Sequence, residues 1–553
     1  MFSKKIPLLV LASILSGSML VGCSQTGNNV GQSENITAKQ ILQNEDARLA
    51  ISMAIDKAQI TDVILNNGSL PANVYVPEGL ALDEDGKDYR EIAGEMGFGF
   101  DKEKAAEHWK KAKDELGFDN TTLEFLTTDS DTSKQIGEYI QNQLEQNLEG
   151  LTIEIKQVPF KQKQQLESQG DFELLYSSWI ADYPDPLTFL ETFTTTGKFG
   201  SNSGYNSAEY NKLVDEDITK NRKIVGTGTI DLNGNVAEAE KVLLNDAYIS
   251  PIYQSSSAYL EKSTVKDIVK SAYGARNTYK WAYVEGKDSF NITSSADLPS
   301  LDASKTTDFY SFDVLNNIME GLTRVDLDGK VVEGMATKWE TSEDKKTWTF
   351  TINDKAYWSN GDKVTAHDFE YAWKRTLNPE TGSQYGFIFY DLVGAEDYSL
   401  GKCSADDVGV KALDDNTLQV TLVRPVNYFD RLVGFPVFFP QNQKFVEEKG
   451  DKYGTTKDDI LSNGPFELTR WKLEDQYTMS KNEKYWDKDV VKLQTINTKI
   501  VKDSSTGINL YEAGEVDSID LATEHVDKFK ESSEFKSTKN ATTFFILINA
   551  GEE

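Results

Sequence analysis

The residues of this sequence that could carry out acid–base chemistry are acidic pairs, such as Asp182 and Asp185 in the segment WIADYPDP. Two carboxyl groups in one site can act as a general acid and a general base. The chain contains 89 acidic and 58 basic residues, which gives a formal net charge of −31. In so acidic a chain such pairs arise by chance, and we therefore interpret this pair as unrelated to catalysis.

Other catalytic and metal-binding patterns are missing from the sequence. It has no Gly-x-Ser-x-Gly motif, no phosphate-binding Gly-rich loop and no His-Glu-x-x-His motif. Its histidines, His108, His367 and His525, lie far apart and lack the spacing of metal ligands. The sequence thus predicts a protein that is not an enzyme and has no metal site and no cofactor. An extracytoplasmic hydrolase stays as an alternative that would need an activated nucleophile.

Length and composition describe an ordinary globular protein. A chain of 553 residues with 39% hydrophobic residues is long enough for roughly two to four domains. The acidic balance argues against nucleic acid as a partner, because nucleic-acid binding needs a basic surface.

The elements expected before residue 190 alternate between strands and helices. A helical repeat of apolar residues begins at Asp46, and Asp101 can cap a second helix that Gly117 ends. The pattern that follows is β-α-β-α-β and predicts a mixed sheet covered by helices. Its expected elements are strands 121–128, 151–160 and 172–186 and helices 133–148 and 160–169.

The second half of the chain has a different sequence pattern, which predicts short strands joined by Asp-Gly or Asn-Gly turns. Trp348, Phe350 and Ile352 alternate with polar residues, as in a strand with one buried face. Thr365 and Asp368 have the spacing of a helix cap. A strong strand is expected at the C-terminal end, in ATTFFILINAGEE.

The N-terminal segment has the pattern of an export signal. Lys4 and Lys5 precede a short apolar run, and Leu-Val-Gly-Cys ends at Cys23. This resembles the lipobox of bacterial lipoproteins, and a plain secretory signal is the alternative. The resemblance implies a signal peptide at 1–22, lipidation of Cys23, and a flexible tether at 23–37 that holds the protein on the extracellular face of the cell membrane. Cys403 would then be the only other cysteine, so no internal disulfide would be possible.

Several segments resemble the extracytoplasmic oligopeptide-binding proteins of peptide ABC transporters, the family 5 solute-binding proteins. The clearest is WETSEDKKTWTFTINDKAYWSNGDKVTAHDFEYAWKR, and the lipoprotein signal suits the Gram-positive form. The other matching segments are SNGPFELTRW, YEAGEVD, DARLAISMAIDK and SWIADYPDPLTFL. The resemblance implies an α/β, two-lobed periplasmic-binding-protein-like fold of type II with three domains.

The order of these segments differs from the order in the family. Segments that come late in the family occupy about 35–287 here, and early ones occupy 288–553. The chain therefore resembles a circular permutation, with the old C-terminus joined to the old N-terminus near 285–290. A rearranged or artificial chain, or two fused gene fragments, are alternatives. Permutation is physically reasonable because domain termini often lie close together.

The permuted order implies a set of domains. Two strand crossings join the lobes in the family, and we expect the chain ends to interrupt one of them while the crossing near 251–260 stays intact. The expected parts are lobe 2 (domain III) at 38–250, a part of lobe 1 (domain I) at 251–325, an inserted domain II at 326–435, and the rest of domain I at 436–553.

The resemblance also implies a binding site. Asp182 matches the residue that binds the α-ammonium of the peptide, and Trp179 and Ile180 match positions that line the peptide groove. Tyr385 and Phe309 match further groove positions. From the residues alone, Asp182 could instead cap a local turn, and Trp179 and Ile180 could be ordinary core residues.

The function implied by the resemblance is the capture of oligopeptides for a membrane-embedded ABC permease, by a monomer held on the membrane by its lipid. A receptor for peptide pheromones or other peptide signals on the same fold is an alternative. A folded but poorly binding permuted chain is another. Peptide length and sequence preference stay open.

Overall fold

A computed structural model of the protein describes residues 36–81, 87–214, 224–225, 229–230, 234–426 and 428–551. Cys23, the predicted lipidation site, lies outside the described residues together with the predicted signal peptide. Residues from Thr37 onward form one compact unit, and the fold below is that of this unit. None of the described helices is long and apolar enough to cross a membrane.

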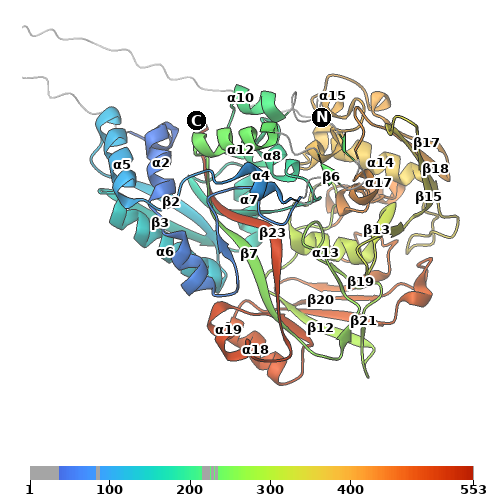
Figure 1. Ribbon diagram of the computed structural model, residues 1–553. Helices are drawn as coiled ribbons and strands as arrows, with labels where there is room; N and C mark the ends of the chain where they lie inside the picture. Colours follow the sequence, from blue (N-terminus) through green and yellow to red (C-terminus); the bar gives the residue numbers. More distant parts are fainter. Residues whose placement is uncertain are drawn as a thin grey trace, which may run out of the picture. The chain divides into compact units, whose positions relative to one another are not determined.

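A mixed sheet forms the centre of the unit (Figure 1). Within the described residues it has 11 strands, in the order β19-β20-β21-β12-β22-β7-β23-β4-β2-β3, with β1 paired to β7. Their bounds are β1 (Leu70–Pro71), β2 (Thr121–Thr128), β3 (Leu151–Val158), β4 (Leu174–Ile180), β7 (Ile249–Glu261), β12 (Ser289–Ser294), β19 (Phe466–Lys472), β20 (Gln476–Lys481), β21 (Thr495–Ile500), β22 (Ser518–Asp520) and β23 (Phe535–Ile548).

One end of the sheet, which we call the β4 half, consists of β4, β2 and β3. β2 is parallel to both neighbours, because α6 (Asp131–Asn147) and α7 (Phe160–Ser168) provide the crossovers. This confirms the predicted β-α-β-α-β pattern. The predicted cap is confirmed too: α5 (Lys102–Leu116) begins where the Asp101 carboxylate accepts the Lys104 N–H, and it ends at Gly117 with φ +75°.

The other end, which we call the β12 half, consists of β12, β22, β21, β20 and β19. β12 is parallel to β21 and β22, and the remaining pairs are antiparallel. A separate four-stranded sheet has the order β15-β16-β18-β17 and packs with α14 (Ala366–Leu377), which begins with the predicted capping box of Thr365 and Asp368. Its strands are β15 (Ala336–Thr341), β16 (Thr347–Ile352), β17 (Val410–Asp414) and β18 (Thr417–Thr421).

Two long strands, β7 and β23, join the halves. β7 pairs with β22 at 259–261 and with β23 over most of its length, and β23 pairs with β4 at 542–548. The expectation that one crossing is interrupted is therefore wrong, because β23 runs unbroken from one half to the other. Its last residues stay in the sheet because Phe545 and Ile546 are fully buried between β7 and β4.

The predicted permutation junction is a tight turn. β11 (Tyr283–Val284) pairs with β8 (Val265–Lys266), and after the turn the chain enters β12. The Lys287 N–H donates to Val284 O at 3.1 Å, and the rings of Tyr279 and Phe290 lie 5.6 Å apart across the turn. The runs on both sides of the turn are therefore neighbours in one structure, and the permuted order itself stays a prediction.

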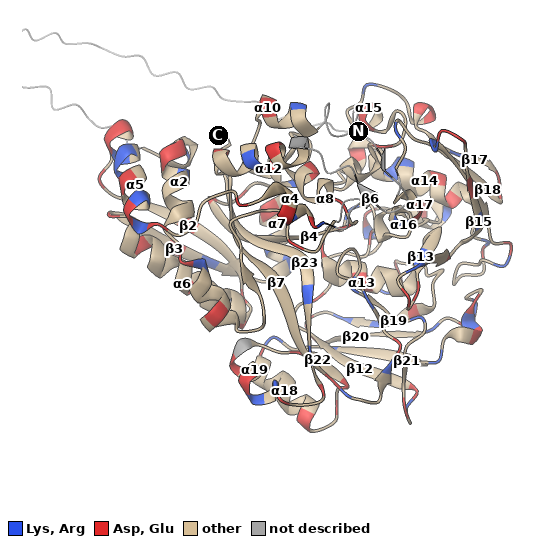
Figure 2. Ribbon diagram, viewed as in Figure 1, with Lys and Arg blue, Asp and Glu red and all other residues tan. Residues whose placement is uncertain are grey.

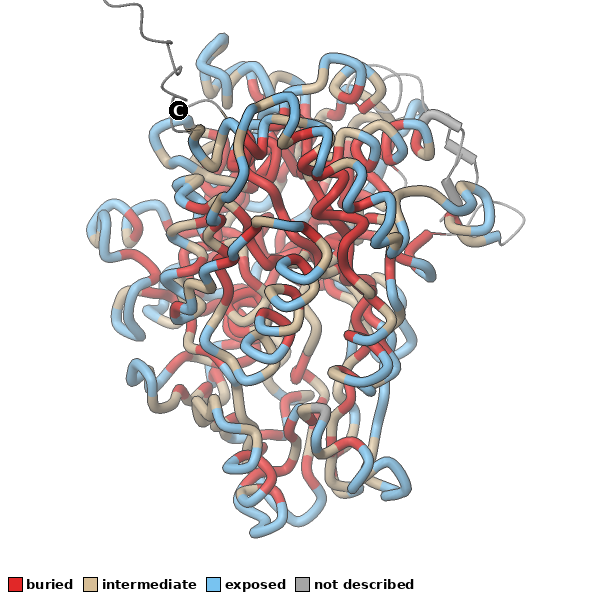
Figure 3. The backbone as a smooth tube through the Cα atoms, turned by 90° about the vertical axis from the view of Figure 1, so that its left-hand side faces the viewer, coloured by how far each residue is buried: buried red, intermediate tan, exposed pale blue. Residues whose placement is uncertain are grey.

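The buried core runs through the middle of the unit, while charged residues lie outside. In the tube view, buried segments fill the centre and exposed segments form the outer helices and loops (Figure 3). Acidic and basic residues are spread over the outer helices, including α5, α6, α18 and α19 (Figure 2). Further helices are α1 (Ala38–Gln43), α2 (Glu45–Met53), α4 (Tyr89–Ala93), α8 (Leu187–Leu190), α9 (Lys198–Ser203), α10 (Ala208–Asn211), α12 (Gly234–Asp246), α13 (Phe309–Ile318), α17 (Gln443–Lys449), α18 (Ser504–Glu512) and α19 (Thr523–Phe529).

Candidate functional site

Asp182 lies just beyond the end of β4, where hydrogen bonds hold the backbone on three sides. The Ala181 N–H donates to Ala541 O at 2.8 Å, and the Gly274 N–H donates to Ala181 O at 2.6 Å. The N–H of Asp182 itself donates to Thr188 Oγ1 at 2.8 Å. These contacts fix the place from which the carboxyl group projects.

The Asp182 carboxyl group bonds to a distant segment of the chain. Tyr385 OH donates to Asp182 Oδ1 at 3.1 Å, although 203 positions separate the two residues. The local turn is capped by Asp185 instead, since its Oδ1 accepts the Leu187 N–H at 2.9 Å. Asp182 therefore connects β4 to the segment before the short 3₁₀ helix at Gly386–Phe389.

Three of the five predicted groove residues lie together. The Trp179 ring stacks on Tyr385 with 5.6 Å between centroids, and Trp179 Nε1 donates to Thr188 O at 2.6 Å. Asp182 completes the group through Tyr385. Ile180 is half-buried on the same strand, where it pairs with Thr542 of β23.

A cavity of about 550 Å³ lies next to this group, with Asp182 in its wall. A volume of this size lies in the range of about 300–1,000 Å³ that is typical of sites for small ligands. The segment between β8 and β10 (Asn277–Thr278), which includes β9 (Val269–Lys270), forms much of the wall. The rest comes from α13 and from residues between 324 and 329 and between 431 and 436. The main lining residues are Asp182, Ile268, Val269, Lys270, Ser271, Ala272, Tyr273, Gly274, Ala275, Asn316, Arg324, Arg431 and Phe435.

Phe309, the fifth predicted residue, lies in a different place. It begins α13 and lines a second cavity of about 160 Å³, where the Arg276 guanidinium lies 4.4 Å from the centroid of its ring. Ile268, Lys270 and Ser271 line both cavities. The two cavities therefore share part of their walls, and the structure does not bring Phe309 into contact with Asp182.

Burial dominates the electrostatics of Asp182. The side chain is 8% exposed, and removal from water raises the pKa of its carboxyl group well above the usual value. The hydrogen bond from Tyr385 and the charge of Lys198 act in the opposite direction. Oδ2 is buried and has no hydrogen-bond partner among the described residues. A cationic donor at this oxygen would satisfy it and favour the ionised carboxylate.

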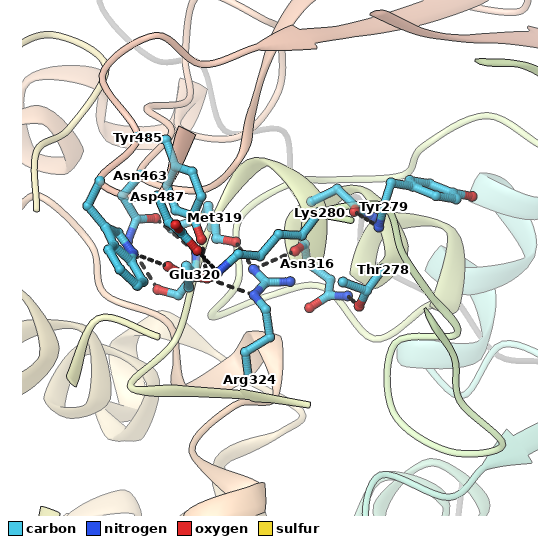
Figure 4. Close-up of polar contacts among 12 residues, drawn as sticks. Thr278, Tyr279, Lys280, Asn316, Met319, Glu320, Arg324, Asn463, Tyr485 and Asp487 are labelled. Carbon is cyan, nitrogen blue, oxygen red and sulfur yellow. Dashed lines mark hydrogen bonds and ion pairs between the residues drawn. The ribbon is translucent and has the colours of Figure 1, made fainter. Parts of the chain in front are cut away.

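A second buried charge cluster surrounds Glu320 (Figure 4). Glu320 accepts hydrogen bonds from Arg324 Nε at 2.7 Å and from Tyr485 OH at 2.6 Å, while Lys280 Nζ lies 2.8 Å from Asp487. Burial acts to raise the pKa of Glu320, but Lys280 and Arg324 outweigh it and hold that pKa below its usual value. This cluster positions Arg324 in the cavity wall with its charge already balanced.

The loop at 268–275, Arg324 and Arg431 were not predicted as site residues. The loop and Arg431 make contacts that join segments far apart in the chain, whereas Arg324 bonds to Glu320 only four positions away, a pairing that the sequence does not mark as part of a site. The one available signal is Gly274, whose φ is +67° and at which a Cβ would lie 3.4 Å from Asp182 O and 3.5 Å from Phe435. Among the residues that the structure describes, no group of three or more His, Cys, Asp and Glu side chains could hold a metal ion.

Comparison with known proteins gives one family. The model described as bacterial extracellular solute-binding proteins, family 5 middle, matches residues 20–201 and 330–553. The dipeptide-binding protein DppE of Bacillus subtilis is 40% identical over 280 residues, which is 51% of this chain and 51% of that protein. The oligopeptide-binding protein OppA of the same organism is 47% identical over 234 residues, 42% of this chain and 43% of that protein. The chain thus spans about half the length of the curated relatives it matches.

Solved structures match over a similar share. The substrate-binding domain of an oligopeptide ABC transporter from Bacillus anthracis is 45% identical with a TM-score of 0.44, and the match covers 45% of this chain and 48% of that one. OppA of Listeria monocytogenes, solved with a bound peptide, is 42% identical with a TM-score of 0.44, over 45% of this chain and 49% of that one.

Proposed function

This chain belongs to family 5 of the bacterial extracellular solute-binding proteins, and from that premise we propose that it captures oligopeptides outside the cell and delivers them to a membrane-embedded ABC permease. In this proposed role the protein performs no chemical step. Its working cycle is closure around a ligand and release of that ligand.

The Asp182 carboxyl group is the observation that carries this proposal. Asp182 lines a cavity of about 550 Å³, and the buried Oδ2 of its carboxyl group has no partner among the described residues. A peptide α-ammonium would form a charge-assisted hydrogen bond there and offset part of the cost of burying the charge. Nearly any peptide offers this group, so the contact selects peptides without selecting their sequence.

The rest of the site would bind the peptide without reading its side chains closely. We assign Trp179, Ile180 and Tyr385 to the wall near the ammonium and Phe309 to the second cavity. The segment 268–275 forms much of the wall of the larger cavity, where it would lie along the bound peptide. Ordered water can fill the space that smaller side chains leave.

Native mass spectrometry of the purified protein, mixed with a pool of random peptides, tests the proposal directly. We expect mass shifts that correspond to one peptide per monomer. Purified protein that carries no peptide and also binds no peptide from the pool would contradict the proposal.

An Asp182→Asn variant tests the anchor. The amide cannot pair with an ammonium as a charge, so we expect peptide affinity to fall by at least about 10-fold, roughly the 1.5–3 kcal/mol of a hydrogen bond to a charged group. The exposed Asp354→Asn change is the matched control and should leave affinity unchanged. Equal affinity in Asp182→Asn and the wild type would remove Asp182 from the site.

Two further parts of the proposal concern place and role. We infer that Cys23 carries the lipid that holds the protein on the extracellular face of the membrane, and intact-mass analysis of protein extracted from membranes would detect the added diacylglycerol and acyl mass.

A peptide-signal receptor on the same fold would differ in ligand range. One tightly bound peptide, with the rest of the pool ignored, would favour that role over nutrient uptake.

A further inference from the structure

Behind the Asp182 site lies a group of three buried charged residues on α7 and α9. Lys163, Glu167 and Lys198 are 5%, 1% and 4% exposed. Lys163 Nζ lies 2.5 Å from Glu167 Oε2 and also donates to Ser177 Oγ at 2.9 Å. Lys198 Nζ lies 3.3 Å from Glu167 Oε1. Two buried ammonium groups therefore share a single carboxylate.

Lys198 is connected to Asp182 through the aromatic residues of the site. Its Nζ lies 5.5 Å from the centroid of the Trp179 ring and 5.2 Å from that of Phe199. Trp179 stacks on Tyr385, and Tyr385 donates to Asp182 Oδ1. A series of direct contacts thus runs from the Lys198 ammonium to the Asp182 carboxyl group.

The charges of this region do not balance within the group of three. Glu167 offsets one lysine and leaves an excess of buried positive charge, which is costly unless a negative group lies nearby. Burial favours the neutral form of Asp182, and the charge of Lys198 opposes that effect on its pKa. Lys198 acts in the same direction on the pKa of the buried Asp308.

The other titratable groups near the site are the buried Asp308 and two tyrosines. Tyr385 is affected by the charges of Asp182 and Asp308, and Tyr75 by those of Asp182 and Glu167. Burial raises the pKa of both phenols well above the usual value, so they stay neutral in the ordinary pH range. Lys198 is thus the cation that remains to balance Asp182.

We propose that Lys198 is a positioning residue of the ligand site, whose buried ammonium supplies the counter-charge that lets Asp182 become a carboxylate before a cationic ligand arrives. The role of the carboxylate rests on the proposed function, whereas the coupling between the two side chains does not. Without Lys198, the carboxyl group would hold its proton to higher pH, and an ammonium ligand would have to displace that proton.

The experiment is a carboxyl ¹³C NMR titration of the full chain, without ligand, after selective labelling of aspartate. The Asp182 signal is assigned by its absence from Asp182→Asn. We expect Lys198→Met to move the titration midpoint of Asp182 upward and Lys198→Arg to leave it close to the wild type. Glu167→Gln removes the charge that offsets the lysines, so it should move the midpoint downward.

The opposite shifts separate an electrostatic role from a structural one, because general loosening of the site would move all variants in one direction. Lys198→Met keeps the Lys163–Glu167 pair, so we expect this variant to fold. If it does not fold, the shift of the Asp182 midpoint between Glu167→Gln and the wild type still tests the proposal. An unchanged midpoint in Lys198→Met, or an upward shift in Glu167→Gln, would overturn the proposal.

Peptide binding is measured separately on the same variants, with the random pool at pH 5 to 9. We expect Lys198→Met to lose affinity mainly at low pH and to approach the wild type at high pH. An affinity loss of equal size at every pH would count against the proposed role. A wild-type protein that binds no peptide but shows the predicted shifts would contradict the proposed function and leave the Lys198 coupling standing.

Discussion

At the scale of the residue, the role proposed for Asp182 sets two opposing requirements. A ligand-binding carboxylate needs a negative charge, but burial favours the protonated form. The resemblance to peptide-binding proteins predicted Asp182, Trp179 and Tyr385 as site residues. It could not predict that Tyr385 donates to Asp182, because only the tertiary fold brings together residues 203 positions apart.

The raised pKa predicts a pH-dependent effect on stability. In the unfolded chain Asp182 ionises near its usual pKa, while in the fold it keeps its proton to higher pH, so ionisation lowers stability as the pH rises above the unfolded pKa. We therefore expect Asp182→Asn to raise the unfolding free energy of the unliganded protein at pH 8 and to change it little at pH 4. Urea titrations at both pH values measure this, and a loss of stability at pH 8 would contradict it.

At the scale of the element, the sequence predicted the features that depend on neighbouring residues, such as helix caps. The Asp101 cap of α5 and the Thr365–Asp368 box of α14 depend on residues within one turn, and the structure confirms both. β23 begins earlier than expected, because 536–539 are exposed polar residues whose strand conformation depends on pairing with β7. No periodic signal in the sequence marks that half of the strand.

The buried half of β23 should carry much of the stability of the sheet. Phe545 is fully buried and contacts Tyr75 and Phe199, with ring centroids 5.5 and 5.1 Å away. We expect Phe545→Ala to lower the unfolding free energy by about 3–5 kcal/mol through lost burial and the cavity it leaves. Denaturant unfolding measures this, with the half-exposed Leu413→Ala as control, expected to cost about 0.5 kcal/mol or less. A loss below about 1 kcal/mol for Phe545→Ala would show that the strand is not packed as described.

At the scale of the whole molecule, the order of the chain is separate from the arrangement of its elements. The turn at 285–288 joins β11 to β12 without a long linker, and β7 and β23 hold both halves of the sheet. The sequence was enough to identify the segments that resemble the family. It did not predict that β23 lies between β4 and β7, because that position depends on pairing between strands far apart in the chain.

Reordering the chain tests the proposed permutation. A chain in which residues 288–553 precede residues 38–287, joined by a flexible Gly/Ser linker, should fold and bind the same peptides, since a longer surface loop costs little free energy. Circular dichroism, thermal unfolding and native mass spectrometry compare the two orders. The control opens the chain between Asn291 and Ile292, inside β12, and should fail to fold. Failure of the first reordered chain, with the present order folding well, would argue against a permutation.

The position of β23 also has a consequence for the order in which the protein is made. β4 and β7 leave the ribosome early, but the strand that separates them, β23, begins only at Phe535, after β7 has ended at Glu261. At ordinary rates of synthesis this delay is on the order of tens of seconds. During that time both strands have a free hydrogen-bonding edge that could pair wrongly. The nascent chain should therefore depend on chaperones or on prompt export until β23 has been synthesised.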